Sequence, residues 1–504
     1  MAASVERWGM FEISTLGKAE GNPFTDYTIR GVFRHKNEIV ETDGFYDGDG
    51  VYKVRFMPSF EGEYTFDVSG TFSDEKTLTG TFTVTPAGER NHGPVRVASK
   101  YHFAYKDSTP YYPIGTTCYA WTHQSEEMRD KTLETLKNNV FNKIRFCILP
   151  KHHLYNFNEP ETYPYEGTPC DSSVLTEENF NDSSVWKGND WDFTKFNPEH
   201  FRRFESYVAE LMKMGIEADV IVMHPYDRWG FRNMSKKDDD LYWNYVVSRL
   251  SAYRNVWWSL ANEYDVMTEK TTDDWERYAS ILCRKDPYNH LCSIHNCNAM
   301  YDHSRPWITH ISYQVSPCGD VEYTNELREK YGKPVVLDEM RYEGNIPYGW
   351  GNLDGRELVR RFWEVMCRGG YPGHSETLVQ SNGKLWWSHG GELLGESPQR
   401  IKFLYEIMTE TPGHGLKLAY SEDGYVMAEP EDAYANPGYF IVYFGVSQSG
   451  FYDFQSDKET SYRAEIIDAW NMTITDAGVY KSGSRINLPR KPYLALRLKE
   501  YVTV

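Results

Sequence analysis

The sequence predicts an α/β fold, a (β/α)8 TIM barrel flanked by an N-terminal and a C-terminal β-sandwich. Through the middle of the chain, apolar segments alternate with helical patterns of period 3.6, whereas both ends show short segments of period two. The 504 residues also exceed one hydrophobic core, because single cores stop growing at about 250 to 300 residues. We therefore expect three domains, at residues 1–95, 96–412 and 413–504.

The N-terminal part alternates apolar and polar residues over short stretches separated by turn clusters. Asp47-Gly-Asp-Gly50 is one such cluster, and glycine and aspartate favour the backbone conformations of turns. This arrangement is typical of an immunoglobulin-like or fibronectin-like β-sandwich. The pattern changes after Asn91-His-Gly-Pro94, which we take as the boundary. The stretches expected to be strands are 27–33, 51–57, 63–68 and 77–84.

The middle of the chain contains eight apolar segments, several of them preceded by clear helical patterns. Residues 199–214 form one such pattern, with Gly215 as its stop, and residues 272–284 form another. Eight strands over about 270 residues fit a (β/α)8 barrel better than a doubly wound sheet, which usually has fewer strands. The expected barrel strands are 112–117, 142–146, 217–222, 256–260, 291–294, 308–313, 334–337 and 370–375.

Alternation of period two returns near the C-terminus, after a helix expected at residues 398–409. It is present in residues 439–444, 462–470, 485–488 and 493–498. These segments predict the C-terminal β-sandwich. We find no internal repeat and no low-complexity tract in the chain.

Composition and charge argue against several classes of protein. No apolar run approaches the roughly 18 to 20 residues of a spanning helix, and no secretory leader is seen, so we expect a cytoplasmic protein without a membrane partner. The net charge of −19 and the lack of a basic stripe argue against nucleic acid as a partner. Homo-oligomer formation stays open. Scattered cysteines at positions 118, 147, 170, 283, 292, 297, 318 and 367 fit reduced thiols.

One short segment has the residue types of a metal site. Cys292-Ser-Ile-His295-Asn-Cys297 matches no common zinc spacing and falls on a strand predicted to be buried and on its exit loop. We therefore expect neither a metal nor another cofactor.

Two predicted strands end in carboxylates. The active site of a (β/α)8 barrel lies at the C-terminal ends of its strands. The fourth predicted strand runs into Asn262 and Glu263, and the seventh runs into Glu339. Glycoside cleavage needs two carboxyl groups across the scissile bond, one to protonate the leaving oxygen and one to attack the anomeric carbon or activate water. Strand ends on opposite sides of a barrel mouth can supply them.

With these motifs, residues 100–410 resemble clan A of the retaining glycoside hydrolases. The likeness is greatest to endoglucanase-like and apiosidase-like proteins that carry a β-sandwich on each side of the barrel. The resemblance implies that Glu263 is the acid/base, that Glu339 is the nucleophile, and that Asn262 contacts the substrate 2-hydroxyl. Such a contact strengthens as the oxocarbenium-like transition state forms.

The resemblance also implies an arginine beside the nucleophile. Arg145, at the end of the second predicted strand, resembles this residue, and its charge would keep Glu339 ionised. Arg341 follows Glu339 by two positions and could play the same part, and the sequence does not choose between them.

Polar and aromatic residues at other strand ends are expected to bind the sugar. His224 and Tyr226 follow the third strand, although His224 could equally be a core histidine. Tyr119 and Trp121 follow the first strand and are candidates for a subsite wall.

The sixth and eighth strands supply the remaining candidates. Many clan members carry His-x-Tyr on the sixth strand, whereas Gln314 falls at the position of the histidine here, which leaves Tyr313 as an imperfect substitute for the tyrosine that bonds the nucleophile. Beyond the eighth strand we expect Glu376 and Trp387, favoured over Trp386, in the region of the clan's aromatic platform.

A long irregular segment, residues 151–192, follows the second strand and is rich in aromatic residues. Loops of this length are usually functional or disordered, and the aromatic content argues against disorder. We expect the segment to form one wall of a pocket, which would favour terminal sugars or short oligosaccharides. Its aromatic residues include Tyr155, Tyr163, Tyr165, Trp186 and Trp191.

The leading hypothesis is a retaining glycoside hydrolase that cleaves a β-type bond in an oligosaccharide or glycoside. The same site could transfer the sugar to another acceptor, as a transglycosidase does. A carbohydrate-binding protein with a degenerate barrel is a second reading, suggested by the altered sixth strand. A metal-dependent hydrolase would need a convergent set of His and carboxylate residues on several strand ends, which we do not find.

Overall fold

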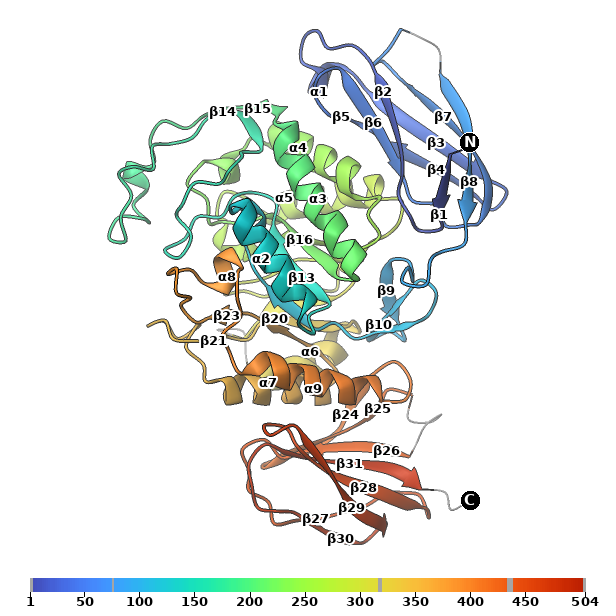
Figure 1. Cartoon of the computed structure of the whole chain (residues 1–504), viewed down its shortest axis with the longest axis vertical. Coiled ribbons are helices and arrows are strands. Elements are labelled where there is room, and N and C mark those ends of the chain that lie inside the picture. The colour runs from blue at the N-terminus through green and yellow to red at the C-terminus, as the bar shows by residue number, and fades with distance from the viewer. Residues whose placement is uncertain (1–2, 75–76, 316–319, 433–437, 502–504) are drawn as a thin grey trace.

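The computed structural model describes residues 3–74, 77–315, 320–432 and 438–501. Antiparallel sheets at the N-terminal end, a central barrel and antiparallel sheets at the C-terminal end follow one another along the long axis (Figure 1). Among the described residues, no helix is both long enough and apolar enough to cross a membrane. Seven of the cysteines are described and none of these forms a disulfide, whereas Cys318 lies outside the described residues.

The central sheet confirms the predicted (β/α)8 fold. Eight parallel strands follow one another in it in chain order around the barrel. At the edge between the fifth and sixth strands, Thr309 N donates a hydrogen bond to the Cys292 carbonyl oxygen at 2.9 Å. The strands are β12 (Gly115–Thr117), β13 (Lys143–Cys147), β16 (Glu217–Met223), β17 (Val256–Ala261), β18 (Cys292–Ser293), β19 (Ile311–Gln314), β20 (Val335–Glu339) and β22 (Tyr371–His374).

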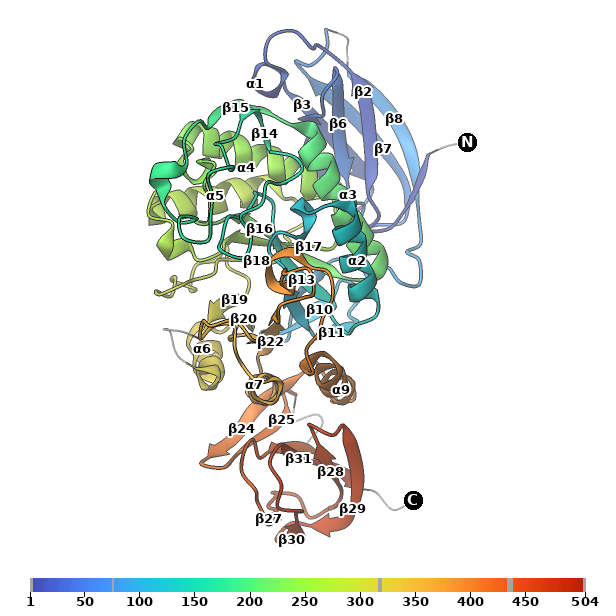
Figure 2. The ribbon, with the colours of Figure 1, turned by 60° about the vertical axis from the view of Figure 1, so that its left-hand side comes forward.

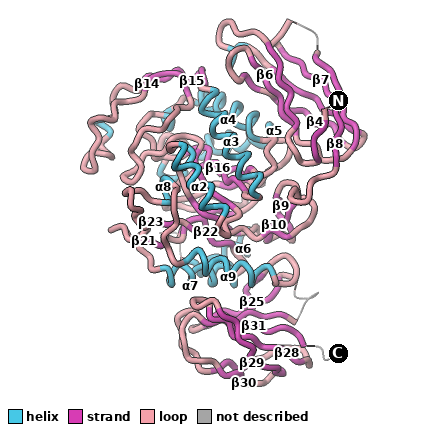
Figure 3. Tube along the Cα trace, in the orientation of Figure 1, coloured by secondary structure: helices cyan, strands magenta, loops and turns pink. Residues whose placement is uncertain are grey.

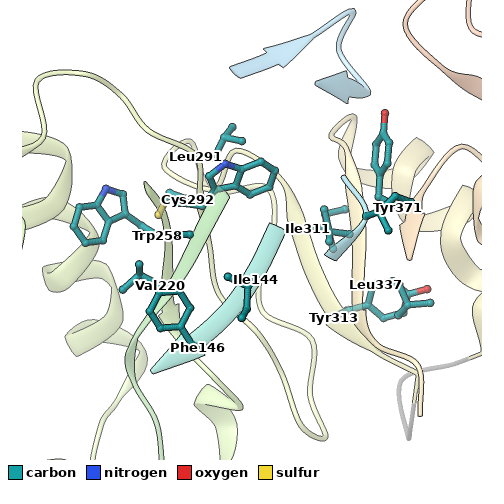
Figure 4. Packing of buried hydrophobic residues seen from close by; sticks show 14 of the residues in the cluster. Ile144, Phe146, Val220, Trp258, Leu291, Cys292, Ile311, Tyr313, Leu337 and Tyr371 are labelled. Carbon is teal, nitrogen blue, oxygen red and sulfur yellow. The ribbon is translucent and has the colours of Figure 1, made fainter. Parts of the chain in front are cut away.

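Side chains alternate between the two faces of each barrel strand, and both faces are buried. On β13, Ile144 and Phe146 lie in the apolar layer of Figure 4, and the ring of Phe146 packs 5.3 Å from that of Phe204. Lys143 and Arg145 have the opposite orientation and point into the barrel, because residues two apart share a face. The run of apolar residues in each strand is nearly continuous, because parallel strands are covered on both sides.

Helices lie around these strands; Figure 3 shows the helices in cyan and the strands in magenta. Asn197 caps the start of the third helix and Gly215, with φ of 75°, ends it, while Thr271 and Asp274 form a capping box at the fifth. The helices are α2 (Glu126–Lys137), α3 (Pro198–Met214), α4 (Lys236–Leu250), α5 (Thr272–Lys285), α6 (Thr324–Tyr331), α7 (Gly355–Cys367), α8 (Trp386–His389) and α9 (Ser397–Thr409), with single 3-10 turns η1 (Trp121–His123), η2 (Ser183–Val185), η3 (Phe231–Asn233), η4 (Tyr264–Val266) and η5 (Val321–Tyr323).

Two sheets form the N-terminal β-sandwich around a core of stacked rings that includes Phe33 and Phe56, 4.3 Å apart. Its Arg55 donates a hydrogen bond to Glu205 of α3 at 3.0 Å, and both side chains are buried, so the sandwich is fastened to the barrel. In spatial order the strands are β1 (Ser4–Glu6), β8 (Leu78–Thr85), β7 (Gly62–Gly70), β3 (Ile29–His35) and β4 (Glu38–Asp43) in one sheet and β2 (Phe11–Leu16), β6 (Val51–Phe56) and β5 (Phe45–Tyr46) in the other, with α1 (Pro23–Asp26) beside them.

A small sheet connects the sandwich to the barrel and covers the N-terminal ends of the barrel strands. Phe103 of this sheet packs against Trp257 and Tyr371, with ring centroids 5.2 Å and 5.3 Å away. Its strands are β9 (Val95–Ala98), β10 (His102–Tyr105) and β11 (Pro110–Tyr111).

The C-terminal sheets pack against α7 and α9, on the side away from the N-terminal sandwich (Figure 2). Trp363 of α7 stacks on Tyr443, with ring centroids 5.2 Å apart. In spatial order the large sheet holds β24 (Leu416–Glu422), β25 (Tyr425–Pro430), β26 (Tyr439–Tyr443), β31 (Leu494–Tyr501), β28 (Ser461–Asp468) and β29 (Thr473–Lys481), and a second sheet pairs β27 (Phe451–Asp453) with β30 (Arg485–Asn487).

The structure adds strands that the sequence pattern did not reveal. β1, β2 and β4 of the N-terminal sandwich fall outside the predicted segments, and residues 112–114 lie before β12 rather than in it. In the long segment after β13, β14 (Tyr165–Thr168) pairs with β15 (Asp190–Phe196). At the other side of the barrel mouth, β21 (Glu343–Gly344) pairs with β23 (Glu376–Thr377).

Candidate active site

Glu339 ends β20 and points into the barrel mouth, where three side chains from other strands converge on it. The hydroxyl of Tyr119 donates a hydrogen bond to Oε1 of Glu339. Nη1 of Arg145 donates to the same oxygen at 3.3 Å, and Nε2 of His295 lies 3.3 Å from it. These groups come from the ends of the first, second and fifth barrel strands, so the closed barrel is what assembles them.

These neighbours favour the ionised form of Glu339. Burial by itself would raise the pKa of the carboxyl group, but His295, Arg145 and Tyr119 outweigh it and hold the pKa well below its ordinary value. Glu339 is therefore a carboxylate over the whole neutral range.

His295 is fixed by a buried chain of hydrogen bonds. Ser312 donates to Oδ2 of Asp338 at 2.5 Å, and Lys143 and Arg145 keep the pKa of Asp338 low, so Asp338 only accepts. The single Ser312 proton is thus committed, and its oxygen accepts from Nδ1 of His295 at 2.9 Å. This bond fixes the ring so that the other nitrogen, Nε2, faces Oε1 of Glu339 at 3.3 Å.

Glu263 follows β17 and has a very different environment. Its backbone is left-handed, with φ of 51°, which costs a non-glycine residue about 1 to 3 kcal/mol and is found most often at functional sites. Tyr226 donates a hydrogen bond to Oε2, and Nε2 of Gln314 donates to Oε1 at 3.2 Å. Burial and the negative charge of Glu339 raise the pKa of Glu263 above its ordinary value, and the bond from Tyr226 offsets only part of this rise.

Asn262 lies close to the surroundings of both carboxyl groups. Its Oδ1 lies 3.2 Å from the hydroxyl oxygen of Tyr119, the residue that bonds Glu339, and Asn262 directly precedes Glu263 in the chain. The site therefore contains two buried carboxyl groups with pKa values moved in opposite directions, which is the arrangement expected of an acid and a nucleophile or base.

Lys151 enters the site from the segment after β13. Its Nζ lies 3.4 Å from the ring centre of Tyr119, 4.1 Å from that of Tyr226 and 4.9 Å from that of Trp387. Burial lowers the pKa of Lys151 to about 8.

Aromatic rings border this part of the site. The ring centre of Trp387 lies 5.2 Å from that of Tyr119 and 5.0 Å from that of Trp350, and His153 contacts the Trp387 ring at 4.9 Å. Tyr155 extends the group toward Trp350, with ring centres 6.4 Å apart. The structure thus brings the predicted Trp387 against Tyr119, which bonds Glu339, whereas Trp386 is fully buried and donates a hydrogen bond to Thr116.

Trp121 does not line this group, contrary to the sequence-based expectation. Its ring is fully buried and packs edge-on against Phe146 and Tyr207, between the barrel and the outer helices. The chain turns into η1 directly after Tyr119, which sends the two aromatic side chains to different layers.

Glu376 is not placed to bind sugar either. Its two oxygens accept hydrogen bonds from the backbone N–H groups of Leu394 and Gly395 at 2.7 Å and 2.8 Å. The side chain is fully buried, and burial raises its pKa to about 7. Glu376 anchors the loop that precedes α9.

The expectation that Tyr313 supports Glu339 is wrong. Neighbouring residues of a strand point to opposite faces, and Ser312 and Gln314 point into the barrel, so Tyr313 points outward. Its side chain belongs to the buried apolar cluster (Figure 4), and its hydroxyl lies 3.4 Å from Oγ1 of Thr324 at the start of α6. Tyr119 makes the bond to the carboxylate instead.

Two open alternatives are decided by position. Arg145 contacts Glu339, whereas Arg341 is exposed. Nε2 of His224 donates a hydrogen bond to the backbone carbonyl oxygen of Leu149 at 3.1 Å, because a carbonyl oxygen only accepts, and this fits the alternative of a buried core histidine. Burial lowers the pKa of His224 to about 3.

Most aromatic residues of the segment 151–192 pack away from the carboxyl groups. Tyr165 lies in the core against Phe231, and Trp191 donates its Nε1 proton to the carbonyl of Trp229 at 2.9 Å. Only the start of the segment, Lys151 to Tyr155, reaches the site.

Sequence reasoning missed two residues of the site. His295 stood in a segment that resembled a metal site, but Cys292 is buried in the core and the histidine faces Glu339. In the described part of the chain no group of three His, Cys, Asp or Glu residues could hold a metal. Lys151 begins an irregular segment, where no periodic signal shows which way a side chain points.

Three families of known proteins match parts of the chain. Residues 98–375 match the apiosidase-like catalytic domain. Residues 4–71 and 431–499 match two domains of unknown function, DUF5060 and DUF5605. A search of curated proteins finds no match.

Solved structures show the same architecture. A crystal structure described as a "putative glycoside hydrolase" from Bacteroides vulgatus shares 36% identity, covers 99% of this chain and 100% of its own, and has a TM-score of 0.90. A family 5 glycoside hydrolase from the same species shares 15% identity over 81% of this chain and 94% of its own, with a TM-score of 0.60, which shows a common fold. The chain belongs to the apiosidase-like family and is a glycoside hydrolase with a (β/α)8 barrel.

Proposed function

We propose that the protein is a retaining glycoside hydrolase that cleaves a β-type glycosidic bond by double displacement. Glu339 attacks the anomeric carbon while Glu263 gives its proton to the leaving oxygen. Glu263 then takes a proton from water, which attacks the same carbon and releases Glu339. The net reaction consumes one water molecule and leaves both carboxyl groups in their starting states.

The observation that carries this proposal is the opposite shift of the two pKa values. A nucleophile must be ionised and a general acid must be protonated at the same pH, and the two environments favour these states. Arg145 and His295 stabilise the charge of Glu339 before attack. Oδ1 of Asn262 lies 3.2 Å from the hydroxyl oxygen of Tyr119, and this position next to Glu263 in the chain supports a contact with the 2-hydroxyl.

We further propose that the enzyme acts on terminal sugars or short oligosaccharides. The segment that begins at Lys151 and the segment after β20 approach each other beside Trp387, where Tyr155 lies 6.4 Å from Tyr348 and 6.4 Å from Trp350 between ring centres. Rings from two loops on one side of the barrel mouth would restrict a polymer that extends in both directions. Release of monosaccharide without an early fall in polymer viscosity would support this part of the proposal, and a rapid fall would contradict it.

Azide rescue tests the roles of the two carboxyl groups. With an activated aryl glycoside, Glu263→Ala should regain activity in azide and give a glycosyl azide of retained configuration, because azide replaces water at the glycosyl-enzyme. Glu339→Gly should give a glycosyl azide of inverted configuration, because azide then replaces the nucleophile itself.

The matched control is Glu217→Gln. It removes a buried carboxyl group from the start of β16, at the opposite end of the barrel, and should keep activity. Exchange of the two azide products, or full activity of either site variant without azide, would contradict the assignment. Longer products in place of hydrolysis would show a transglycosidase, and tight glycan binding without turnover by the wild type would show a binding protein.

A further inference from the structure

Lys151 carries a buried positive charge that no described residue pairs. Its side chain is only 3% exposed. Within the described ranges its Nζ makes neither a hydrogen bond nor an ion pair, and three aromatic rings lie within 5 Å of it, measured to their centres. Two of these rings belong to Tyr119 and Tyr226, which bond Glu339 and Glu263. The ammonium group therefore lies within the site, next to the two tyrosines that bond the carboxyl groups.

The rings offset only part of the cost of this burial. An ammonium over an aromatic face gains about 0.5 to 2 kcal/mol, whereas an ammonium group removed from water without a partner loses several kcal/mol. In agreement with this balance, burial lowers the pKa of Lys151 to about 8, and the group is still mostly charged at neutral pH. A hydrogen-bond acceptor with a negative charge would complete the site.

The carboxyl groups of the enzyme do not fill this need. The charge of Glu339 is already shared between Arg145 and His295, each 3.3 Å away. Glu263 is protonated when the enzyme is ready to act as an acid. In that state no described carboxylate pairs the charge of Lys151.

We infer that Lys151 binds a carboxylate of the sugar, so that the substrate is a glycoside of a uronic acid. Nζ faces Trp387 and Tyr119, whose rings border the region where the sugar must lie to reach Glu339. An ammonium at this position gives a charge-assisted hydrogen bond to the carboxylate and rejects the neutral sugar, for which the charge would stay unpaired. The inference rests on the proposed function in taking a sugar as the occupant and Glu263 as the protonated acid.

Binding of free sugars tests the inference without requiring turnover. Titration calorimetry would compare D-glucuronate with D-glucose and D-galacturonate with D-galactose. For the wild type, at least one uronate should bind about tenfold to a hundredfold more tightly than its neutral counterpart, as expected for a hydrogen bond to a charged group. Equal binding within both pairs, or binding of no uronate, would overturn the inference.

Variants of Lys151 distinguish the effect of its charge on uronate binding from the effect of its packing. Lys151→Met keeps the apolar stem and Lys151→Gln keeps a donor, and both should lose the preference for the uronate while the melting temperature shows that they fold. Lys402→Met removes an exposed charge from α9 and should keep the preference. Retention of the preference in Lys151→Met would also overturn the inference.

Kinetics distinguish this inference from the proposed mechanism. Hydrolysis of a 4-nitrophenyl glycosiduronate should fall steeply in Lys151→Met, mainly through KM. If a uronate binds through Lys151 but Glu263→Ala and Glu339→Gly show no azide rescue, the mechanism fails and the binding site stands. If the azide products are as expected but neutral aryl glycosides are the better substrates, the mechanism stands and the uronate assignment fails.

Discussion

The hydroxyl of Tyr119 donates a hydrogen bond to Glu339 from the end of a different barrel strand. The tyrosine is itself buried, and its ring lies under the Lys151 ammonium. This contact replaces the one that the sequence pattern assigned to the sixth strand, and it favours the ionised carboxylate.

Replacement of Tyr119 by phenylalanine should therefore weaken catalysis without unfolding the protein. We expect kcat to fall by about tenfold to a hundredfold, because a hydrogen bond to a charged group contributes about 1.5 to 3 kcal/mol. The acid limb of kcat/KM should move to higher pH. A Tyr119→Phe enzyme with wild-type kcat and an unchanged acid limb would show that the bond has no role.

His295 should set the acid limb more strongly than Tyr119, because it makes the largest contribution that lowers the pKa of Glu339. In His295→Asn the pKa of Glu339 should rise toward its ordinary value, so activity at low pH is lost first. The measurement is the pH profile of kcat/KM beside that of Ser312→Ala. This variant removes the acceptor for Nδ1 and the donor to Asp338 but keeps the imidazole, so it should give a smaller shift in the same direction. A larger shift in Ser312→Ala would contradict the proton arrangement.

Tyr226 should affect the alkaline limb of the pH profile of kcat/KM. Its hydrogen bond to Glu263 lowers a pKa that burial and Glu339 have raised, so its loss raises that pKa further. In Tyr226→Phe the alkaline limb of kcat/KM should move to higher pH while the acid limb stays in place. Movement of the alkaline limb to lower pH would contradict the assignment of Glu263 as the acid.

The interior of the barrel below the site depends on Lys143. Its Nζ donates to Asp219 at 2.5 Å and to Asp338 at 2.9 Å, and all three side chains are buried. Lys143→Met leaves two carboxylates without their counter-ion and should reduce the free energy of unfolding by about 3 to 5 kcal/mol, measured by urea denaturation at neutral pH. A loss below about 1 kcal/mol would show that water or rearrangement replaces the ammonium group.

Glu217 makes the stability depend on pH. Burial raises its pKa from 4.5 to about 8, so between these values the folded protein holds a proton that the unfolded chain has released. Its contribution to stability is complete below pH 4.5 and is lost as the pH rises through about 8. Glu217→Gln keeps an acceptor for Nε1 of Trp257 and should gain stability over the wild type from about pH 5 to about pH 9. A constant difference across that range would contradict the raised pKa.

The eight barrel strands could be predicted because each is covered on both faces and therefore reads as an apolar run. Short edge strands such as β1 and β4 carry half-exposed residues and gave no comparable pattern. Glu263 and Glu339 could be found because they close two of the apolar runs, and strand ends of a barrel meet at one mouth.

Side-chain direction explains why other predictions failed. Tyr313 was chosen because it is a tyrosine. Its neighbours Ser312 and Gln314 point into the barrel, so Tyr313 points outward and cannot reach Glu339. Trp121 lies beyond a sharp turn, and Glu376 bonds backbone groups of a loop that is 18 residues away in sequence. Contacts of this kind depend on the packed loops, which no local pattern encodes.

Proton NMR of the first product formed by the wild-type enzyme tests the central claim most directly. The substrate is whichever aryl β-glycoside or β-glycosiduronate the enzyme cleaves, followed in D2O before the free sugar mutarotates. Attack by Glu339 followed by water predicts that the β-anomer appears first and the α-anomer grows in later. An α-anomer that appears first would show a single displacement by water and would contradict Glu339 as the nucleophile.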